Sequence, residues 1–312
     1  MCYLLCACGS GCAHVPRQPL GAPQPLPPEL AAYYDYAPHT HQATVTLLRT
    51  HRGFRESLVH FPLIAPGFEP TEPTVEFEWM ESTWPGRRAA IIFNPILGGD
   101  YPLERGMCRY LAARGFHVAL LHRKTLKISP EHPVDHLELL LRQGVLRMRQ
   151  VVDWVAANDR VDPARIGSEG ISMGGMASVM LAAVEPRVRA HFVALAGGSI
   201  PDILATSRDK LILKPRARYL QRNSMDQHTL DRQLREAIRT DPLRLAPYVD
   251  PRTLFMTIAL SDRTIGRANA FRLWEALGRP PVVLLPTGHY TSYLFLPYLN
   301  VMSLHFFRRT LQ

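Results

Sequence analysis

Short apolar runs alternate with amphipathic segments along most of this chain, and the alternation predicts its fold. The first two strand-like segments are rich in β-branched and aromatic residues. The later runs are continuously apolar, which is typical of strands that are buried on both faces of a sheet. Strands are predicted at Thr44–Thr50, Thr74–Trp79, Ala89–Phe93, Phe116–Leu121, Arg165–Gly167, Ala190–Ala196, Thr253–Leu260 and Val282–Leu285.

Segments between these runs carry apolar residues at helical spacing. The longest of them places a stripe of leucine, valine and methionine along one face, from Leu137 to Val155, over about five turns. Buried strands that alternate with helices are typical of a mostly parallel sheet flanked by helices, so the pattern predicts an α/β fold. The helices are predicted at Leu103–Arg114, Val134–Asn158 and Met173–Val184.

The stretch of about residues 198–250 interrupts this alternation. It has a helical pattern and is too long to be a simple connection between two sheet strands, so we expect an inserted cap. Between residues 208 and 239, nine Lys and Arg residues stand against four Asp and Glu residues. A basic cap favours an anionic acyl substrate or an anionic membrane surface; the alternative is a solvated helical face.

Composition narrows the class of protein without indicating an activity. The chain has 312 residues, of which 46% are hydrophobic and 20% charged, and this excludes a disordered chain. No apolar run is long enough to predict a transmembrane helix. The net charge is +9, but only four of the 36 basic residues are lysines and no nucleic-acid-binding motif is present. We therefore expect no nucleic-acid partner.

The N-terminal residues differ in composition from the rest of the chain. Four of the five cysteines lie within residues 1–12 and the fifth, Cys108, stands alone. This spacing indicates neither a disulfide framework nor a complete zinc site. Residues 13–43 form a proline-rich extension, and we expect a stiff, solvated tether there because proline disfavours both helix and sheet.

The segment 1–12 resembles the start of a bacterial lipoprotein. Leu5-Cys6-Ala7-Cys8 fits the pattern of small residues before a lipid-modified cysteine, and Gly9-Ser10-Gly11-Cys12 contains a second candidate. The resemblance implies a signal segment, lipidation at Cys8 or Cys12 and a protein anchored to a membrane of the bacterial envelope. The alternative is an unstructured tail on a cytoplasmic protein.

A motif for nucleophilic chemistry lies between a predicted strand and a predicted helix. Gly170-Ile171-Ser172-Met173-Gly174 has the form G-x-S-x-G, with the strand ending just before it and the helix beginning at Met173. A serine at such a turn is strained, and glycines on both sides let the backbone close without Cβ clashes. The helix N-terminus then directs its free N–H groups at the reacting centre.

In this segment the chain resembles the α/β-hydrolase superfamily, in its serine esterase and prolyl-oligopeptidase-like branches. The resemblance covers roughly residues 74–309 and implies a catalytic triad in the order serine, acid, histidine. Ser172 is the implied nucleophile, Asp262 follows the predicted strand Thr253–Leu260, and His289 follows the last predicted strand. Asp202 is the second choice for the acid, because some relatives place it one strand earlier.

The resemblance also implies an oxyanion hole formed by two backbone N–H groups. One donor is Met173, directly after the nucleophile, and the other lies in the loop that begins at Asn94. Relatives have His-Gly at the start of this loop, whereas this chain has Asn94-Pro95. Because proline has no N–H, the second donor is expected at Ile96 or, as the alternative, at Leu97.

These residues predict a serine hydrolase that works through an acyl-enzyme. The resemblance implies a small-molecule carboxylic ester as the substrate, a carboxylesterase-type activity, because esters are the commonest substrates of this architecture. Thioester, amide or peptide cleavage on the same residues is the near alternative. A non-catalytic binding protein with this fold is a third interpretation. No metal, flavin or nucleotide site is indicated by the sequence, so no cofactor is expected.

Overall fold

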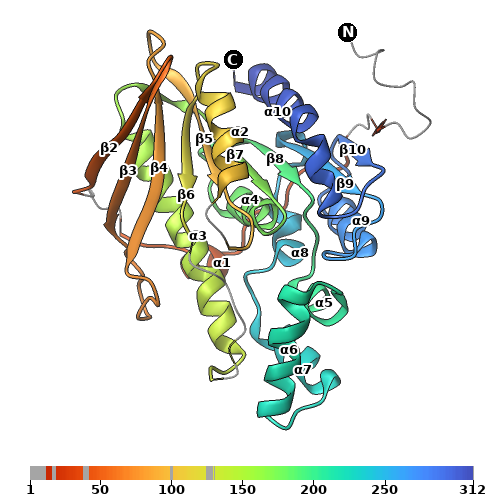
Figure 1. The fold of residues 1–312 in the computed structure, drawn as a ribbon. Coiled ribbons are helices and arrows are strands. Elements are labelled where there is room, and N and C mark those ends of the chain that lie inside the picture. Colours follow the sequence, from red (N-terminus) through yellow and green to blue (C-terminus); the bar gives the residue numbers. More distant parts are fainter. Residues whose placement is uncertain are drawn as a thin grey trace.

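The computed structural model describes residues 12–15, 19–37, 42–98, 101–123, 129 and 131–311. In these residues a single large sheet carries helices on both faces (Figure 1). Its ten strands follow the order β1-β10-β9-β8-β7-β5-β6-β4-β3-β2. The predicted α/β fold is confirmed.

The sheet is parallel over the six strands from β10 to β6, and β4, β3 and β2 extend it antiparallel. Strand β5 lies between β6 and β7, so the order of the strands reverses beside it. In parallel sheets, ligands bind at the carboxyl ends of the strands next to such a reversal. The strands are β1 (Ala13–Val15), β2 (Thr44–His51), β3 (Phe54–Pro62), β4 (Thr74–Ser82), β5 (Arg88–Asn94), β6 (His117–Leu121), β7 (Val161–Ile171), β8 (Val188–Ala194), β9 (Leu254–Ala259) and β10 (Val282–Leu285).

Two helical layers bury the apolar faces of this sheet. Helices α2 (Pro102–Ala112) and α10 (Leu296–Leu311) pack on one face. The other face is covered by α3 (Asp135–Ala156), α4 (Met173–Val184) and α9 (Arg267–Ala276). The three helices expected from the sequence correspond to α2, α3 and α4. Helix α4 has the predicted bounds, and α2 and α3 differ from the prediction by one residue at the start and two at the end.

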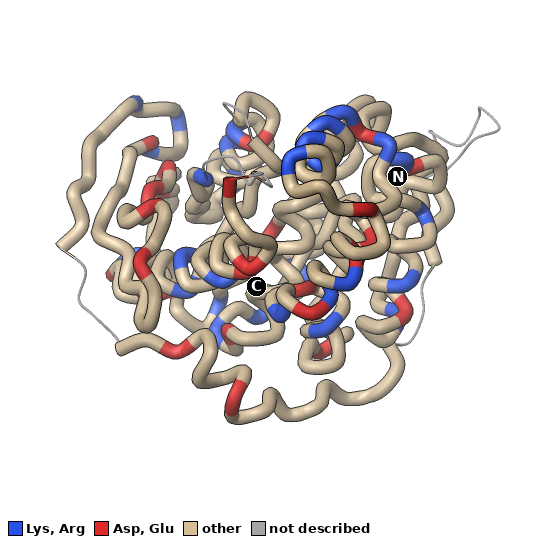
Figure 2. The backbone as a smooth tube through the Cα atoms, turned by 90° about the horizontal axis from the view of Figure 1, so that it is seen from below, with Lys and Arg blue, Asp and Glu red and all other residues tan. Residues whose placement is uncertain are grey.

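A three-helix cap stands away from the sheet between β8 and β9 (Figure 1). It consists of α5 (Ile200–Thr206), α6 (Lys210–Arg222) and α7 (Gln227–Ala237). Figure 2 shows the molecule from this end, with Lys and Arg in blue. The chain then returns to the body through α8 (Pro242–Leu245) and the 3-10 turn η1 (Ala246–Tyr248), which pack on α4. The free-standing part is therefore shorter than the expected stretch of about residues 198–250.

The proline-rich extension is not the solvated tether that the sequence predicted. β1 pairs antiparallel with β10 at the edge of the sheet. Further along, the Leu20 N–H donates to the Gly278 carbonyl at 2.7 Å. Helix α1 (Pro28–Tyr33) precedes Tyr34, which is fully buried. Proline removes donors and restricts the backbone, but the remaining N–H groups and apolar side chains can still dock on a folded surface.

The predicted lipidation sites, Cys8 and Cys12, precede this extension in the chain. Cys8 lies outside the described residues, and Cys12 is half-buried directly before β1. Lipidation of Cys8 or Cys12 stays a prediction, which incorporation of a radiolabelled fatty acid into the full-length protein would test. In the part of the chain that the structure describes, no helix is long and apolar enough to cross a membrane.

Candidate active site

Ser172 lies at a sharp turn between β7 and α4, at the carboxyl edge of the sheet. Its φ of 57° and ψ of −119° are unfavourable for a residue with a side chain. The turn requires glycine on both sides. A Cβ on Gly170 would lie 2.2 Å from the carbonyl oxygen of Gly174, and a Cβ on Gly174 would lie 1.9 Å from that of Asn94. The local backbone therefore explains why the motif has glycine at these two positions.

The structure brings Ser172, His289 and Asp262 into one hydrogen-bonded chain. The Ser172 Oγ lies 3.0 Å from His289 Nε2, and His289 Nδ1 lies 2.7 Å from Asp262 Oδ2. A carboxylate can only accept, so the ring donates from Nδ1 and its Nε2 is the acceptor for the serine hydroxyl. These three residues come from the carboxyl ends of β7, β9 and β10.

The candidate acid, Asp262, and the candidate base, His289, are held by their own loops. The second carboxylate oxygen of Asp262 accepts from the N–H groups of Thr264 and Ile265 at 2.8 and 2.9 Å. Beside His289, the Ser292 hydroxyl donates to the Gly288 carbonyl at 2.8 Å. The side chains of His289 and Asp262 are 11% and 3% exposed, so water is largely excluded from the contact between them. This geometry suits the orientation of an imidazole by a carboxylate.

Asp202, the second choice for the acid, does not contact His289. It lies in α5 and forms ion pairs with Arg235 and Arg272. Burial alone would raise the pKa of Asp202, but the hydrogen bonds from these two arginines hold the pKa below its usual value. Its carboxylate therefore anchors the cap helices to α9.

The loop expected to complete the oxyanion hole differs from the prediction at Ile96. The Ile96 N–H donates to Glu104 Oε1 at 3.1 Å, so in this structure that donor is directed at a buried carboxylate. Two carbonyls of the loop, those of Pro95 and Ile96, accept from the Arg123 side chain at 2.7 and 2.8 Å. Leu97, the alternative donor, lies one residue further along and lines the pocket. Met173 opens α4, where an N–H has no partner within its own helix.

An apolar pocket of about 260 Å³ lies beside Ser172, between the body and the cap. Core residues such as Met176 and Leu299 line it from one side, and Ile203 and Ile212 line it from the cap. Of the described residues in its lining, none is Lys or Arg, while Glu104 and Asp209 are carboxylates. An anionic acyl group, one of the expectations for the basic cap, therefore meets no cation among these lining residues.

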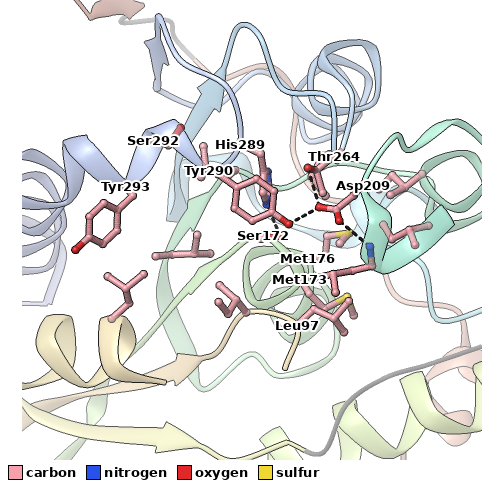
Figure 3. A pocket seen from close by; sticks show the side chains of 18 of the residues that line it. Leu97, Ser172, Met173, Met176, Asp209, Thr264, His289, Tyr290, Ser292 and Tyr293 are labelled. Carbon is pink, nitrogen blue, oxygen red and sulfur yellow. Dashed lines mark hydrogen bonds between the residues drawn. The ribbon is translucent and has the colours of Figure 1, made fainter. Parts of the chain in front are cut away.

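Asp209 links the cap to the loops that carry the acid and the base (Figure 3). Its carboxylate accepts from the hydroxyl of Tyr290, the residue after His289, and from the hydroxyl of Thr264 at 3.2 Å. Burial alone would raise the pKa of Asp209, but these donors and the Leu211 N–H hold the pKa below its usual value. This link has no signature in the sequence, because Asp209 resembles any other helix N-cap.

Comparison with known proteins identifies the family. The Prolyl oligopeptidase family matches residues 108–284, which is more than half of the chain. The uncharacterized protein Rv2627c of Mycobacterium tuberculosis (strain ATCC 25618 / H37Rv) is 26% identical over 148 residues, or 47% of this chain. The chain spans about a third of the length of the curated relatives it matches.

Solved structures with a similar fold include esterases and a peptidase. Acetyl xylan esterase 1 from Thermoanaerobacterium sp. JW/SL YS485 superposes with a TM-score of 0.64 at 17% identity, covering 89% of this chain and 96% of that chain. The acetyl xylan esterase from Paenibacillus sp. R4 superposes with a TM-score of 0.66 at 16% identity, covering 88% of this chain and 92% of that chain. Pyrococcus horikoshii acylaminoacyl peptidase superposes with a TM-score of 0.59 at 14% identity, covering 83% of this chain and 42% of that chain. The fold is that of the α/β hydrolases, and the chain belongs to the prolyl oligopeptidase family of serine hydrolases.

Proposed function

We propose that this protein cleaves carboxylic esters through an acyl-enzyme intermediate formed on Ser172. The single observation that carries the proposal is the chain of hydrogen bonds from Ser172 through His289 to Asp262, with Ser172 and His289 in the lining of an apolar pocket. An unactivated serine hydroxyl is a weak nucleophile, and this arrangement supplies the base and the acid that orients it.

In the proposed reaction, Ser172 Oγ attacks the acyl carbonyl while His289 Nε2 takes its proton. The resulting imidazolium is stabilised by Asp262, and it then donates the proton to the leaving alcohol. Water, activated by the same histidine, attacks the acyl-enzyme and releases the acid. The Met173 N–H is the proposed first donor to the oxyanion. Leu97 is the proposed second donor, because Glu104 accepts from the Ile96 N–H.

The pocket favours an apolar acyl group. Its described lining is formed mostly by leucine, isoleucine and methionine from both the body and the cap. Such a surface binds a hydrocarbon chain by the hydrophobic effect and gains little from a short acetyl group. Thioesters and amides react by the same steps, and membership of a peptidase family favours amide cleavage as the second candidate.

The experiment that tests this proposal compares hydrolysis of p-nitrophenyl esters of increasing chain length, and of matched p-nitroanilides, by wild type and Ser172→Ala. We expect kcat/KM for esters to fall about 10⁴-fold or more in the variant, as when a catalytic serine is removed. Ser261→Ala is the matched control, because Ser261 is an exposed serine beside the acid. Equal activity of wild type and Ser172→Ala would refute the assignment. Faster cleavage of anilides than of esters would favour the peptidase alternative.

A further inference from the structure

Exposed apolar side chains border the mouth of the pocket on two sides. Leu211 comes from the first turn of α6 and is 64% exposed. Opposite, the 3-10 turn η3 (Thr291–Phe295) presents Tyr293 and Leu294, which are 57% and 75% exposed. Leu211 and Tyr293 also line the pocket, so its apolar interior continues onto the outer surface. Large exposed apolar residues that gather around one opening indicate an interaction surface.

Helix α6 carries a row of cations next to this apolar rim. Every fourth residue is basic and exposed, and the row consists of Lys210, Lys214, Arg218 and Arg222. Leu211 lies one residue from Lys210 and three from Lys214, so apolar and cationic groups share one helix surface. Like charges at this spacing repel one another, and a negatively charged surface would relieve the repulsion.

Acidic side chains near the cap do not neutralise this row. Helix α6 contains no acidic residue, and its N-cap Asp209 directs its carboxylate to Tyr290 and Thr264. On the neighbouring helices, Asp202 and Asp231 lie close to Arg235. Among the described residues, no ion pair involves any of the four cations of this row. The fifth basic residue of α6, Arg216, donates to the carbonyls of Leu204 and Ala205 within the cap. The four cations of the row are therefore available to an external anion.

We infer that this end of the molecule docks on an anionic phospholipid bilayer. Leu211 and Leu294 enter the interface, the cations of α6 contact lipid phosphates, and an acyl chain passes from the bilayer into the pocket. Apolar groups beside cations on one helix are typical of proteins that bind at a bilayer surface. This inference rests on the proposed esterase function for its last step, whereas docking itself needs no catalysis.

Co-sedimentation with vesicles tests the inference. Wild type should bind vesicles of phosphatidylglycerol and phosphatidylcholine, bind vesicles of phosphatidylcholine alone far more weakly, and lose binding as salt is raised. Lys210→Gln/Lys214→Gln should weaken binding about 25-fold, since each lysine near an anionic surface contributes about fivefold. Arg308→Gln/Arg309→Gln removes two exposed charges from the end of α10, and this control should bind like wild type.

A second variant tests whether the cap binds a lipid bilayer or any polyanion. Leu211→Ser/Leu294→Ser should also weaken vesicle binding, because insertion of apolar groups adds to the attraction between charges. Equal vesicle binding by wild type and the double-lysine variant would overturn the inference. Retention on heparin with no binding to anionic vesicles would also overturn it.

Activity measurements distinguish this inference from the proposed function. The lysine variant should hydrolyse a water-soluble p-nitrophenyl ester at the wild-type rate, and Ser172→Ala should bind vesicles like wild type. Wild type that binds vesicles but does not hydrolyse the ester would refute the proposed esterase activity and leave the docking intact. Hydrolysis without binding would refute the docking alone.

Discussion

Two glycines on either side of Ser172 show how single residues set the geometry of the candidate site. Gly170 and Gly174 lie where any Cβ would overlap a backbone oxygen. The sequence motif predicted this turn correctly, because the turn depends on residues that are adjacent in the chain. Local geometry of this kind can be predicted from one sequence.

A methyl group at Gly174 is expected to disrupt this turn. Gly174→Ala should lower the free energy of unfolding by roughly 3 kcal/mol or more, because the clash is with backbone and neither side can move away easily. The control is Gly144→Ala in α3, where an added Cβ meets nothing within 4 Å. It should raise the free energy of unfolding by about 0.5–1 kcal/mol. Urea denaturation measures both, and equal effects of the two variants would contradict the account.

Glu169, three residues before Ser172, is a buried carboxyl group on the opposite face of the sheet from α4. It is 0% exposed, and the hydroxyl of Ser303 in α10 donates to it. Burial raises the pKa of Glu169 to about 8, and the bond from Ser303 offsets only part of the effect. The folded protein therefore keeps a proton on Glu169 at pH values where the unfolded chain releases it.

The stability that Glu169 contributes should therefore depend on pH. It is fully present below the unfolded pKa near 4.5 and is lost as the pH rises through the folded pKa near 8. The free energy of unfolding of wild type should fall relative to that of Glu169→Gln, by up to about 1.4 kcal/mol per pH unit in that window. Urea denaturation at several pH values measures the difference, and a constant difference would show that Glu169 is ionised in the folded protein.

At the scale of elements, the cap is joined to the loops of the candidate acid and base by the Asp209 carboxylate and by the Arg208 N–H, which donates to the Arg263 carbonyl at 3.2 Å. Asp209 begins α6 and bonds to Tyr290 and Thr264, which follow the candidate base and acid by one and two residues. The sequence predicted a cap and named Ser172, Asp262 and His289, which the structure brings together, but it did not predict this contact. Contacts between segments that lie far apart in the chain depend on how the elements pack, which no local pattern encodes.

Loss of this link should loosen the cap. Tyr290→Phe should lower kcat/KM for esters by roughly 3–10-fold, the effect of one hydrogen bond to a charged group at a partly exposed position. Amide hydrogen exchange at the start of α6 should become faster. Tyr293→Phe removes a hydroxyl from the same rim, and within the described residues no hydrogen bond joins that hydroxyl to Asp209. If both variants behave alike, the link has no role.

The loop after β5, proposed to hold an oxyanion donor, is a second element that the sequence predicted only in part. Its position follows from the topology, and the proposed donor Met173 follows from the motif. The bond from the Ile96 N–H to Glu104 was not predicted, because Glu104 lies in an amphipathic helix where an acidic residue is ordinarily solvated. A buried carboxyl group that accepts a hydrogen bond from a neighbouring loop has no signature in a single sequence.

At the scale of the whole molecule, the described residues of the N-terminal extension pack against the body and do not form a solvated tether. β1 extends one edge of the sheet, and the chain then passes to the face covered by α3. The buried hydroxyls of Tyr34 and Thr240 are hydrogen-bonded at 2.9 Å, and buried Tyr36 donates to the partly exposed Asp153 at 2.5 Å. The sequence did not predict this packing. A high proline content predicts little regular structure, but it does not predict that the segment is exposed.

Removal of the extension should therefore destabilise the protein. A variant that lacks residues 1–37 loses both buried tyrosines, and its free energy of unfolding should fall by at least about 3 kcal/mol. A variant that lacks residues 1–27 keeps α1 and both tyrosines and should lose much less. Thermal and urea denaturation compare the two, and equal stability of both variants and wild type would support the solvated tether after all.

Covalent trapping tests whether Ser172 is a nucleophile activated by His289. A fluorophosphonate reacts with serine only where a base activates the hydroxyl. Mass spectrometry of the treated protein should find one adduct per chain, on the peptide that contains Ser172. The adduct should be lost in His289→Ala and retained in Ser261→Ala. An adduct on a different serine, or a folded wild-type protein that forms none, would contradict the account.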